Sequence, residues 1–360
     1  MIAEALASVR PTDEAAVREA GALSDRLTKP RGSLGRLEEL GARLAAIAGA
    51  CPPPVPEPAT VAVFAGDHGV LEEGVSPWPQ EVTAQMVANL CAGGAAVNVL
   101  ARHGGATVVV VDVGVATPLA PAPGLLQRRV RPGTANLLRE PAMTVAEAWD
   151  ALDVGATVAA EAVAGGARCL VTGDMGIANT TASAALVAAF TGRPPGEVTG
   201  RGTGIDDATL ARKVAVVEAA LARAAAAGHL DPADPVATLA SVGGLEIAAI
   251  AGFVVGGAAG RVPVIVDGVV ALAGLLAAVA LAPGVIGYCI AGHRSTEPGA
   301  TAALDHLGLD PLVDLGMRLG EGTGACLALP IVQAAAKVLA EMATFDSAGV
   351  TDKGPTEGTP

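Results

Sequence analysis

The chain has 360 residues, of which 51% are hydrophobic and 16% charged, and its formal net charge is −13. This composition excludes disorder or a coiled coil for most of the chain, and the negative charge argues against nucleic acid or an anionic membrane as a partner. With two Trp, one Tyr and four Phe against 46 Gly, the core must be packed by aliphatic side chains with backbones close together.

The first 20 residues carry charges where a secretory signal needs an apolar segment, so no signal is predicted. The five Cys residues form no CxxC pair, which is typical of reduced thiols in the cytoplasm. Residues 268–292 lack charge and are long enough to span a membrane. Because Pro283 and Gly284 break this run, we interpret it as a buried helix followed by a buried parallel strand, and not as a membrane span.

The elements predicted along the chain are mostly strands that alternate with helices. Helices are expected over 12–27 and 35–48, followed by a Pro-rich connector at 51–58. Strands are expected at 60–65, 107–113, 168–172, 236–240, 262–266 and 285–291. Helices are expected at 82–102, 145–164, 181–190, 206–227, 245–257, 269–282 and 329–343, and a disordered tail at 347–360. This alternation predicts an α/β fold with a parallel sheet and right-handed crossovers.

Polar or glycine-rich loops follow nearly every predicted strand. They include 66–70, 173–181, 241–246, 267–268 and 292–299. The carboxyl ends of parallel strands lie at one edge of the sheet, where open α/β sheets bind ligands. Together these loops therefore predict a binding site at that edge.

Single loops leave alternatives open. The 173–181 loop, with Asn179, fits either an anion site at a helix start or a simple N-cap with turn glycines. The 200–206 loop has three glycines but no preceding strand, which excludes a dinucleotide site and leaves a phosphate nest open. Lys213, two turns further on, fits either a phosphate ligand or a solvated surface charge.

Two segments with acidic residues are candidates for a catalytic or metal-binding role. Asp67 and His68 fit an acid–base pair or metal ligands, but a structural or substrate-orienting role is favoured because no second His cluster supplies metal spacing. Glu321 lies between Gly320 and Gly322 beside apolar residues. It fits either a partly desolvated base with a raised pKa or a residue of a helix N-terminus.

The whole set of loops resembles the nicotinate-nucleotide–dimethylbenzimidazole phosphoribosyltransferase family. The matching segments run in the family's order and are KPRGSLGRLE (29–38), GDHGV (66–70), GVSPWPQEVTAQM (74–86), GGAAVN (93–98), GDMGIANTT (173–181), GHRSTEPG (292–299) and GEGTGA (320–325). The resemblance implies transfer of the 5-phosphoribosyl group from nicotinate mononucleotide to 5,6-dimethylbenzimidazole. The products are α-ribazole 5′-phosphate and nicotinate, with inversion at C1′.

The resemblance also implies roles for individual residues. Glu321 is the general base that takes the imidazole proton. The implied benzimidazole contacts are Ser76, Gln85, Met86 and Leu319. The implied nucleotide and phosphate contacts are Asp174, Gly176, Ile177, Asn179, Gly202, Gly204, Lys213 and Ser295. Two residues depart from the family pattern, because Asp174 stands where Glu is expected and Trp78 where Tyr or Phe is usual.

The family's architecture implies a Rossmann-like parallel sheet with helices on both faces, in a catalytic domain over 59–328. A small helical domain would be formed by 1–50 and 329–346. The family further implies a cytoplasmic homodimer that needs no cofactor or metal, with nicotinate mononucleotide and dimethylbenzimidazole as its small-molecule partners. The alternatives are a phosphoribosyltransferase that uses another aromatic base, or a nucleotide-binding protein without catalysis.

Overall fold

The computed structural model describes residues 1–351 and contains two compact units. The larger unit comprises Met1–Arg10 and Glu57–Leu329, and the smaller one comprises Pro11–Pro56 with the described residues from Pro330 onward. The sequence placed residues 1–10 in the small domain. They belong to the larger unit instead, because α1 (Ile2–Ser8) packs on its helices and the Ile2 N–H donates to Asp153 at 2.9 Å.

The larger unit is built on a parallel sheet with the strand order β3-β2-β1-β4-β5-β6. The strands are β1 (Ala59–Gly66), β2 (Ala106–Gly114), β3 (Leu125–Gln127), β4 (Cys169–Met175), β5 (Val264–Val266) and β6 (Cys289–Ala291). This order reverses between β1 and β4, which is the switch point where doubly wound sheets bind ligands. The predicted Rossmann-like α/β fold is confirmed.

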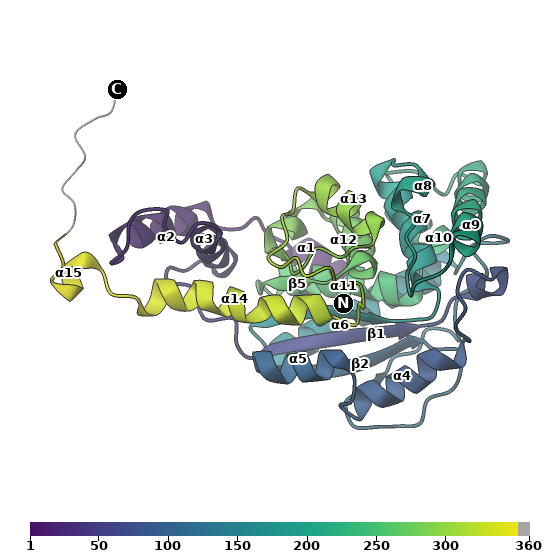
Figure 1. The fold of residues 1–360 in the computed structure, drawn as a ribbon, viewed down its shortest axis with the longest axis horizontal. Helices are drawn as coiled ribbons and strands as arrows, with labels where there is room; N and C mark the ends of the chain where they lie inside the picture. The colour runs from purple at the N-terminus through teal and green to yellow at the C-terminus, as the bar shows by residue number, and fades with distance from the viewer. Residues whose placement is uncertain (352–360) are drawn as a thin grey trace. The chain divides into compact units, whose positions relative to one another are not determined.

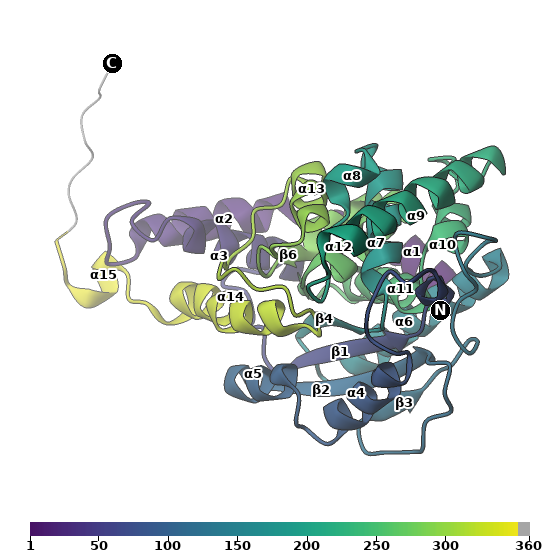
Figure 2. The same cartoon turned by 45° about the vertical axis from the view of Figure 1, so that its right-hand side comes forward.

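Helices cover both faces of this sheet (Figures 1 and 2), with α4 and α5 on one face and α6 and α11 on the other. The helices are α4 (Glu81–Cys91), α5 (Ala96–Gly104), α6 (Val145–Ala164), α7 (Asn179–Thr191), α8 (Pro195–Val198), α9 (Asp207–Ala226), α10 (Pro235–Val242), α11 (Leu245–Ala259), α12 (Val269–Leu281) and α13 (Pro298–Leu307), with 3-10 turns at Gly69–Glu73 and Pro283–Tyr288. Helix α14 (Thr323–Glu341) begins in this unit and continues past Pro330 into the smaller one.

The smaller unit contains α2 (Glu14–Arg26), α3 (Arg36–Ala48), the second part of α14 and α15 (Phe345–Ala348). Asp13 caps α2 by accepting hydrogen bonds from the backbone N–H groups of Ala15 and Ala16. Leu27, Ala45 and Leu339 meet in its core. Small residues let these helices approach closely, since a Cβ at Gly41 would lie 2.8 Å from the Leu339 side chain.

Several predicted elements differ from the structure. Residues 236–240, expected as a strand, form α10, because Asp234 caps the segment at the Ala237 N–H (3.0 Å) and Pro235 suits a first helical turn. The strand expected at 285–291 is shortened to β6 by a 3-10 turn, and the helix at 82–102 is divided into α4 and α5. The short strand β3 was not predicted. Residues 347–348 of the expected disordered tail belong to α15, and 352–360 lie outside the described residues.

Two described stretches, Glu81–Gly104 and Thr323–Glu341, are long and apolar enough to cross a membrane by length and composition. The first is divided between α4 and α5, and over half of the apolar window in the second is buried in the protein. Core helices pass the same test. The apolar run at 268–292 contains α12, whose residues from Val269 to Ala278 are buried, so this run is the core helix that the sequence predicted.

Close backbone contact between α6 and α11 explains how a core with few aromatic residues is filled. A Cβ added at Gly252 of α11 would overlap the Leu152 carbonyl oxygen of α6, and one added at Gly155 would overlap that of Ala249. At these two positions only hydrogen fits. The sheet is therefore covered by helices that pack nearly backbone to backbone.

The substitution Gly252→Ala tests this contact. Alanine favours a helix over glycine by about 0.5–1 kcal/mol, but overpacking costs about 1–3 kcal/mol, so we expect a net loss of stability measured by urea or thermal unfolding. The matched control is Gly21→Ala in α2, where the added Cβ meets nothing within 4 Å, and which should be neutral or stabilising. A Gly252→Ala protein as stable as the wild type would contradict the packing argument.

Candidate active site

A cavity of about 360 Å³ lies at the carboxyl edge of the sheet, where β4 and β5 end and α4 and α7 begin. Its wall combines apolar side chains with buried carboxyl groups, backbone of two glycine-rich loops and one arginine. The lining residues are Trp78, Val82, Met86, Asp174, Met175, Gly176, Ile177, Asn179, Thr180, Gly202, Thr203, Gly268, Val269, Val270, Ser295, Glu297, Arg318, Leu319, Gly320 and Glu321.

The structure brings most of the sequence-predicted residues together around this cavity. Those that line it are Met86, Asp174, Gly176, Ile177, Asn179, Gly202, Ser295, Leu319 and Glu321. Four predicted residues do not line it. Gln85 is exposed on α4, and Ser76 is partly buried, with its Oγ accepting the Trp78 N–H at 3.3 Å. Gly204 and Lys213 lie next to lining residues, Gly204 beside Arg318 and Lys213 beside Thr180.

Glu321 lies in the loop that precedes α14, and its backbone has an uncommon conformation. Its φ is +63°, a left-handed value that a residue other than glycine rarely adopts. The carboxyl group is largely buried, and its Oε2 has no hydrogen-bond partner. Desolvation raises the pKa of Glu321, and the charge of Asp267 adds to this effect, although a hydrogen bond from the Val97 backbone opposes it. The residue thus has the environment of a general base.

Asp174, at the end of β4, lies directly beneath the Glu321 loop. A Cβ at Gly320 would be 3.2 Å from its Oδ1. Its Oδ2 accepts a hydrogen bond from Asn179 Nδ2 at 2.9 Å, whereas Oδ1 is unpartnered. Burial, followed by the charges of Asp267 and Glu246, raises the pKa of Asp174 well above its ordinary value. Despite the shorter side chain, this residue reaches the cavity wall.

Lys213 is buried, so it is not a solvated surface charge, which was the alternative to a phosphate ligand. Its Nζ donates to Thr180 Oγ1 at 2.7 Å and to the Gly200 carbonyl at 3.2 Å. Burial lowers the pKa of Lys213 to about 8. A Cβ on the lining residue Gly202 would be 3.5 Å from Nζ, so the lysine places a cation immediately behind the 200–204 loop.

Two charged residues of the wall were missed by the sequence analysis. Arg318 lies on an exposed loop and donates to the Gly202 carbonyl at 2.6 Å. Glu297 accepts the Gly202 N–H at 2.8 Å. Arg318 stands three residues before Glu321, and Glu297 stands in the segment 292–299 two residues after Ser295. Their place in or beside matching segments was a usable signal, but the contact with a loop about 100 residues away was not visible in the sequence.

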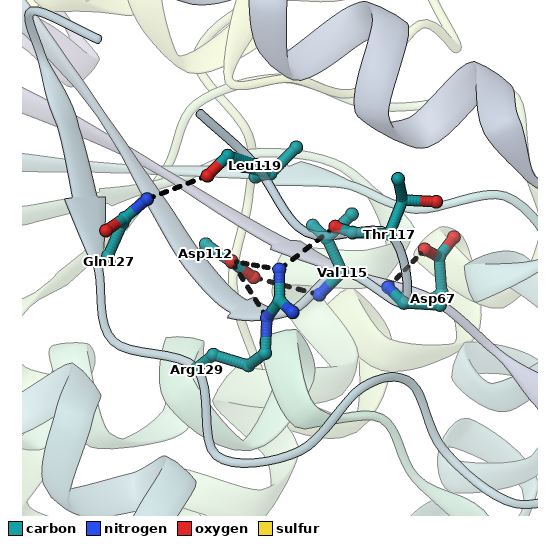
Figure 3. Close-up of polar contacts among 8 residues, drawn as sticks. Asp67, Asp112, Val115, Thr117, Leu119, Gln127 and Arg129 are labelled. Carbon is teal, nitrogen blue, oxygen red and sulfur yellow. Dashed lines mark hydrogen bonds and ion pairs between the residues drawn. The ribbon is translucent and has the colours of Figure 1, made fainter. Parts of the chain in front are cut away.

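Asp67 and His68 have partners in the protein away from the cavity wall. His68 Nε2 lies 2.7 Å from Glu246 Oε1, and both side chains are fully buried. Burial alone would lower the pKa of His68, but the charge and hydrogen bond of Glu246 outweigh it and raise the pKa. Asp67 Oδ2 accepts the Ala116 N–H at 2.8 Å (Figure 3). These contacts support the structural alternative for both residues. Within residues 1–351, no group of three or more His, Cys, Asp or Glu is arranged to hold a metal ion.

The strand order and the cavity at the carboxyl edge of the sheet define an α/β protein with a candidate site for a small molecule. The family model described as phosphoribosyltransferase matches residues 9–350, and the chain belongs to this family.

Several similar proteins carry the name nicotinate-nucleotide–dimethylbenzimidazole phosphoribosyltransferase. The protein of this name from Salinispora tropica is 58% identical, with 98% of this chain and 100% of that protein covered. The one from Chloroflexus aggregans is 54% identical, with 98% and 99% covered. A crystal structure from Thermus thermophilus superposes with a TM-score of 0.89 at 48% identity, covering 95% of this chain and 100% of that one. The resemblance in the sequence motifs is confirmed.

The raised pKa of Asp174 predicts how stability responds to pH in the variant Asp174→Asn. The unfolded chain ionises this group above about pH 4, whereas the folded protein resists ionisation. The wild type therefore loses stability as the pH rises, until the pH passes the raised pKa. We expect the stability of the variant relative to the wild type to increase in thermal unfolding as the pH rises above about pH 4.

The control is Asp206→Asn, at the N-cap of α9. Hydrogen bonds from Thr209 lower the pKa of Asp206, so its contribution to stability has the opposite sign, being present above about pH 4 and lost in acid. The Asp206→Asn variant should therefore lose stability relative to the wild type as the pH rises. Equal pH responses of the two variants would contradict the assigned environments.

Proposed function

We propose that this protein transfers the 5-phosphoribosyl group from nicotinate mononucleotide to 5,6-dimethylbenzimidazole, giving α-ribazole 5′-phosphate and nicotinate. The observation that carries the proposal is the carboxyl group of Glu321, which has an unpartnered oxygen and a raised pKa at the wall of the cavity. The names and full-length identity of the relatives support the choice of substrates.

The reaction needs one proton acceptor. In our proposal, one imidazole nitrogen of the base forms a bond to C1′ of the ribose while Glu321 Oε2 takes the proton from the other nitrogen. The bond between C1′ and the nicotinate nitrogen breaks, and its electron pair neutralises the pyridinium ring. The leaving group therefore needs little acid assistance. Attack from the face opposite the leaving ring inverts C1′, and holding the two rings on opposite faces lowers the barrier further.

The apolar part of the wall fits an aromatic base. Val82, Met86 and Leu319 contribute aliphatic surface beside Glu321, and Trp78 contributes the one aromatic ring of the lining. A flat, uncharged benzimidazole suits such a surface, because burial of apolar area drives its binding. We keep Ser76 and Gln85 as proposed contacts, since both belong to the segment that carries Trp78 and Met86.

The opposite part of the wall fits the phosphate and nicotinate. Backbone of the 176–180 turn at the start of α7 supplies N–H groups and a helix dipole, which favour an anion. We propose that Lys213 supplies positive charge from behind, with Gly204 beside the same loop, and that the exposed Arg318 adds a second cation. The remaining proposed nucleotide contacts are Asp174, Gly176, Ile177, Asn179, Gly202 and Ser295.

The test of this function is to incubate the purified protein with nicotinate mononucleotide and dimethylbenzimidazole and to detect α-ribazole 5′-phosphate by chromatography. Glu321→Gln should lower kcat by about 10²–10⁴-fold, because a positioned base contributes that much, while thermal unfolding confirms a folded protein. No product from the wild type would refute the function. Full activity of the variant would refute only the role of Glu321.

Competition and binding assays separate the two alternatives. A phosphoribosyltransferase for another base would prefer adenine or a phenol when these compete with dimethylbenzimidazole for nicotinate mononucleotide. A non-catalytic nucleotide-binding protein would bind nicotinate mononucleotide in calorimetry without releasing nicotinate. Either result would replace the proposed function.

The low pKa of Lys213 predicts a pH dependence of nucleotide binding. With a pKa of about 8, Lys213 is charged below that pH and neutral above it. The phosphate binds the charged form better, so we expect KM for nicotinate mononucleotide to rise between about pH 8 and pH 9.5, while Lys213→Met should start from a high and pH-independent KM. A flat KM in the wild type would contradict the role of Lys213.

We propose further that the protein works as a homodimer in the cytoplasm. Trp78 and Leu319 line the cavity yet are 48% and 57% exposed, and Leu315, four residues before Leu319, is 66% exposed. A second copy that covers these side chains would close the site. None of the five cysteines forms a disulfide, which suits a reducing compartment. Light scattering of the purified protein measures the oligomeric state directly.

A further inference from the structure

We propose that Asp267 is a positioning residue for the reaction, which fixes the loop that carries Glu321 by binding two backbone N–H groups at the start of α14. This inference rests on the proposed function and on the proposed role of Glu321. Asp267 follows β5 directly and is fully buried. It is not among the residues that line the cavity, so it would act on the reaction indirectly, through Glu321.

The two hydrogen bonds bracket the first turn of α14. Asp267 Oδ2 accepts the Gly322 N–H at 3.2 Å, and Oδ1 accepts the Ala325 N–H at 2.9 Å. Gly322 follows Glu321 directly, and Ala325 lies in the first turn of the helix, whose N–H groups have no partner within the helix. A carboxylate from a distant strand thus serves as the cap of α14 and holds the residue after the base.

The Glu321 loop needs these two hydrogen bonds because its backbone is strained. Gly320, Glu321 and Gly322 have consecutive φ values of +80°, +63° and +97°. For Glu321 this conformation persists only when the surroundings impose it. A relaxed loop would turn the carboxyl group in a different direction, and misplacement by about 1 Å can cost about 10²-fold in rate.

Strand β4 of the sheet in turn fixes the position of Asp267. Its backbone N–H donates to Thr172 Oγ1 at 3.0 Å, and Thr172 belongs to β4. The loop also lies against β4, since a Cβ at Gly173 would overlap the Glu321 carbonyl oxygen. The contacts therefore run without interruption from β4 through Thr172 and Asp267 to the loop, and β4 also carries Asp174 at the cavity.

Ionisable groups surround Asp267 on several elements. His293, after β6, has its Nε2 3.5 Å from Asp267 Oδ1. Asp174 of β4, Glu321 of the loop and Cys326 of α14 each have a pKa raised in part by the charge of Asp267. Removing that charge while keeping the shape of the side chain should therefore lower the pKa of Glu321.

The test is Asp267→Asn, which keeps one acceptor oxygen and turns an amide group toward the other N–H. We expect kcat to fall by about 10²-fold with a smaller change in KM for nicotinate mononucleotide, since the proposed nucleotide contacts other than Arg318 lie on other loops. The acid limb of the kcat profile should move to lower pH. In the Glu321→Gln background, the same change should lower the residual rate by less than about threefold, because the base it positions is already absent.

The matched control is Asp112→Asn. Asp112 is also a buried carboxylate near the end of a strand, β2, where it accepts the Val115 N–H at 2.9 Å and pairs with Arg129 (Figure 3), but it makes no hydrogen bond to the Glu321 loop. This substitution should leave kcat unchanged. If Asp267→Asn does not fold, Thr172→Val is the alternative variant. It removes the hydrogen bond from the Asp267 N–H to Thr172 and should lower kcat in the same way, with KM unchanged.

Two results would overturn the inference. One is an equal loss of rate for Asp267→Asn in the wild-type and Glu321→Gln backgrounds, and the other is a rise in KM with kcat unchanged. Both require an active wild type and an impaired Glu321→Gln variant. An inactive wild type would instead refute the proposed function, and an unimpaired Glu321→Gln variant would refute the assignment of the base.

Discussion

Several carboxyl groups are buried at the carboxyl edge of the parallel sheet, and the rest of the structure depends on this burial because the surrounding loops must supply their hydrogen-bond partners. Asp174, Glu246, Asp267 and Glu321 each lose water there, and each unpaired buried charge costs free energy. Hydrogen bonds stabilise three of these carboxyl groups. Backbone N–H groups donate to Asp267, an imidazole pairs with Glu246, and a side-chain amide donates to Asp174. One oxygen each of Asp174, Glu246 and Glu321 has no partner, and of these residues Asp174 and Glu321 line the cavity. In our proposal, Glu321 is the one that accepts a proton there.

The same edge must accept an anionic phosphate in a protein with a net charge of −13. Two individual side chains supply positive charge near the cavity. Lys213 is buried next to the 200–204 loop, and the exposed Arg318 contacts the same loop. Gly202 offers its N–H to Glu297 and its carbonyl to Arg318. Nucleotide binding would then exchange internal partners for substrate partners. This arrangement favours selectivity for the ligand's shape over general attraction of anions.

Much of the fold could be predicted, because long amphipathic or apolar segments bounded by Pro and Gly carry a strong local signal. The prediction failed where that signal was ambiguous. Residues 236–240 are apolar in either state, and the cap at Asp234 decided for a helix. The strand β3 has only three residues. For the site, motifs identified Glu321, Asp174 and the 173–181 loop, which the structure brings together. The link from Asp267 to Gly322 spans 55 residues, and nothing in the local sequence of either partner specifies it.

The central claim is that a benzimidazole held beside Glu321 attacks the ribose from the face opposite nicotinate. The most direct measurement is the anomeric configuration of the product formed by the purified protein from nicotinate mononucleotide and dimethylbenzimidazole, determined by NMR. The account predicts the α-anomer alone, with one nicotinate released for each ribose transferred. Formation of the β-anomer would require a covalent intermediate or attack from the same face, and would contradict the account.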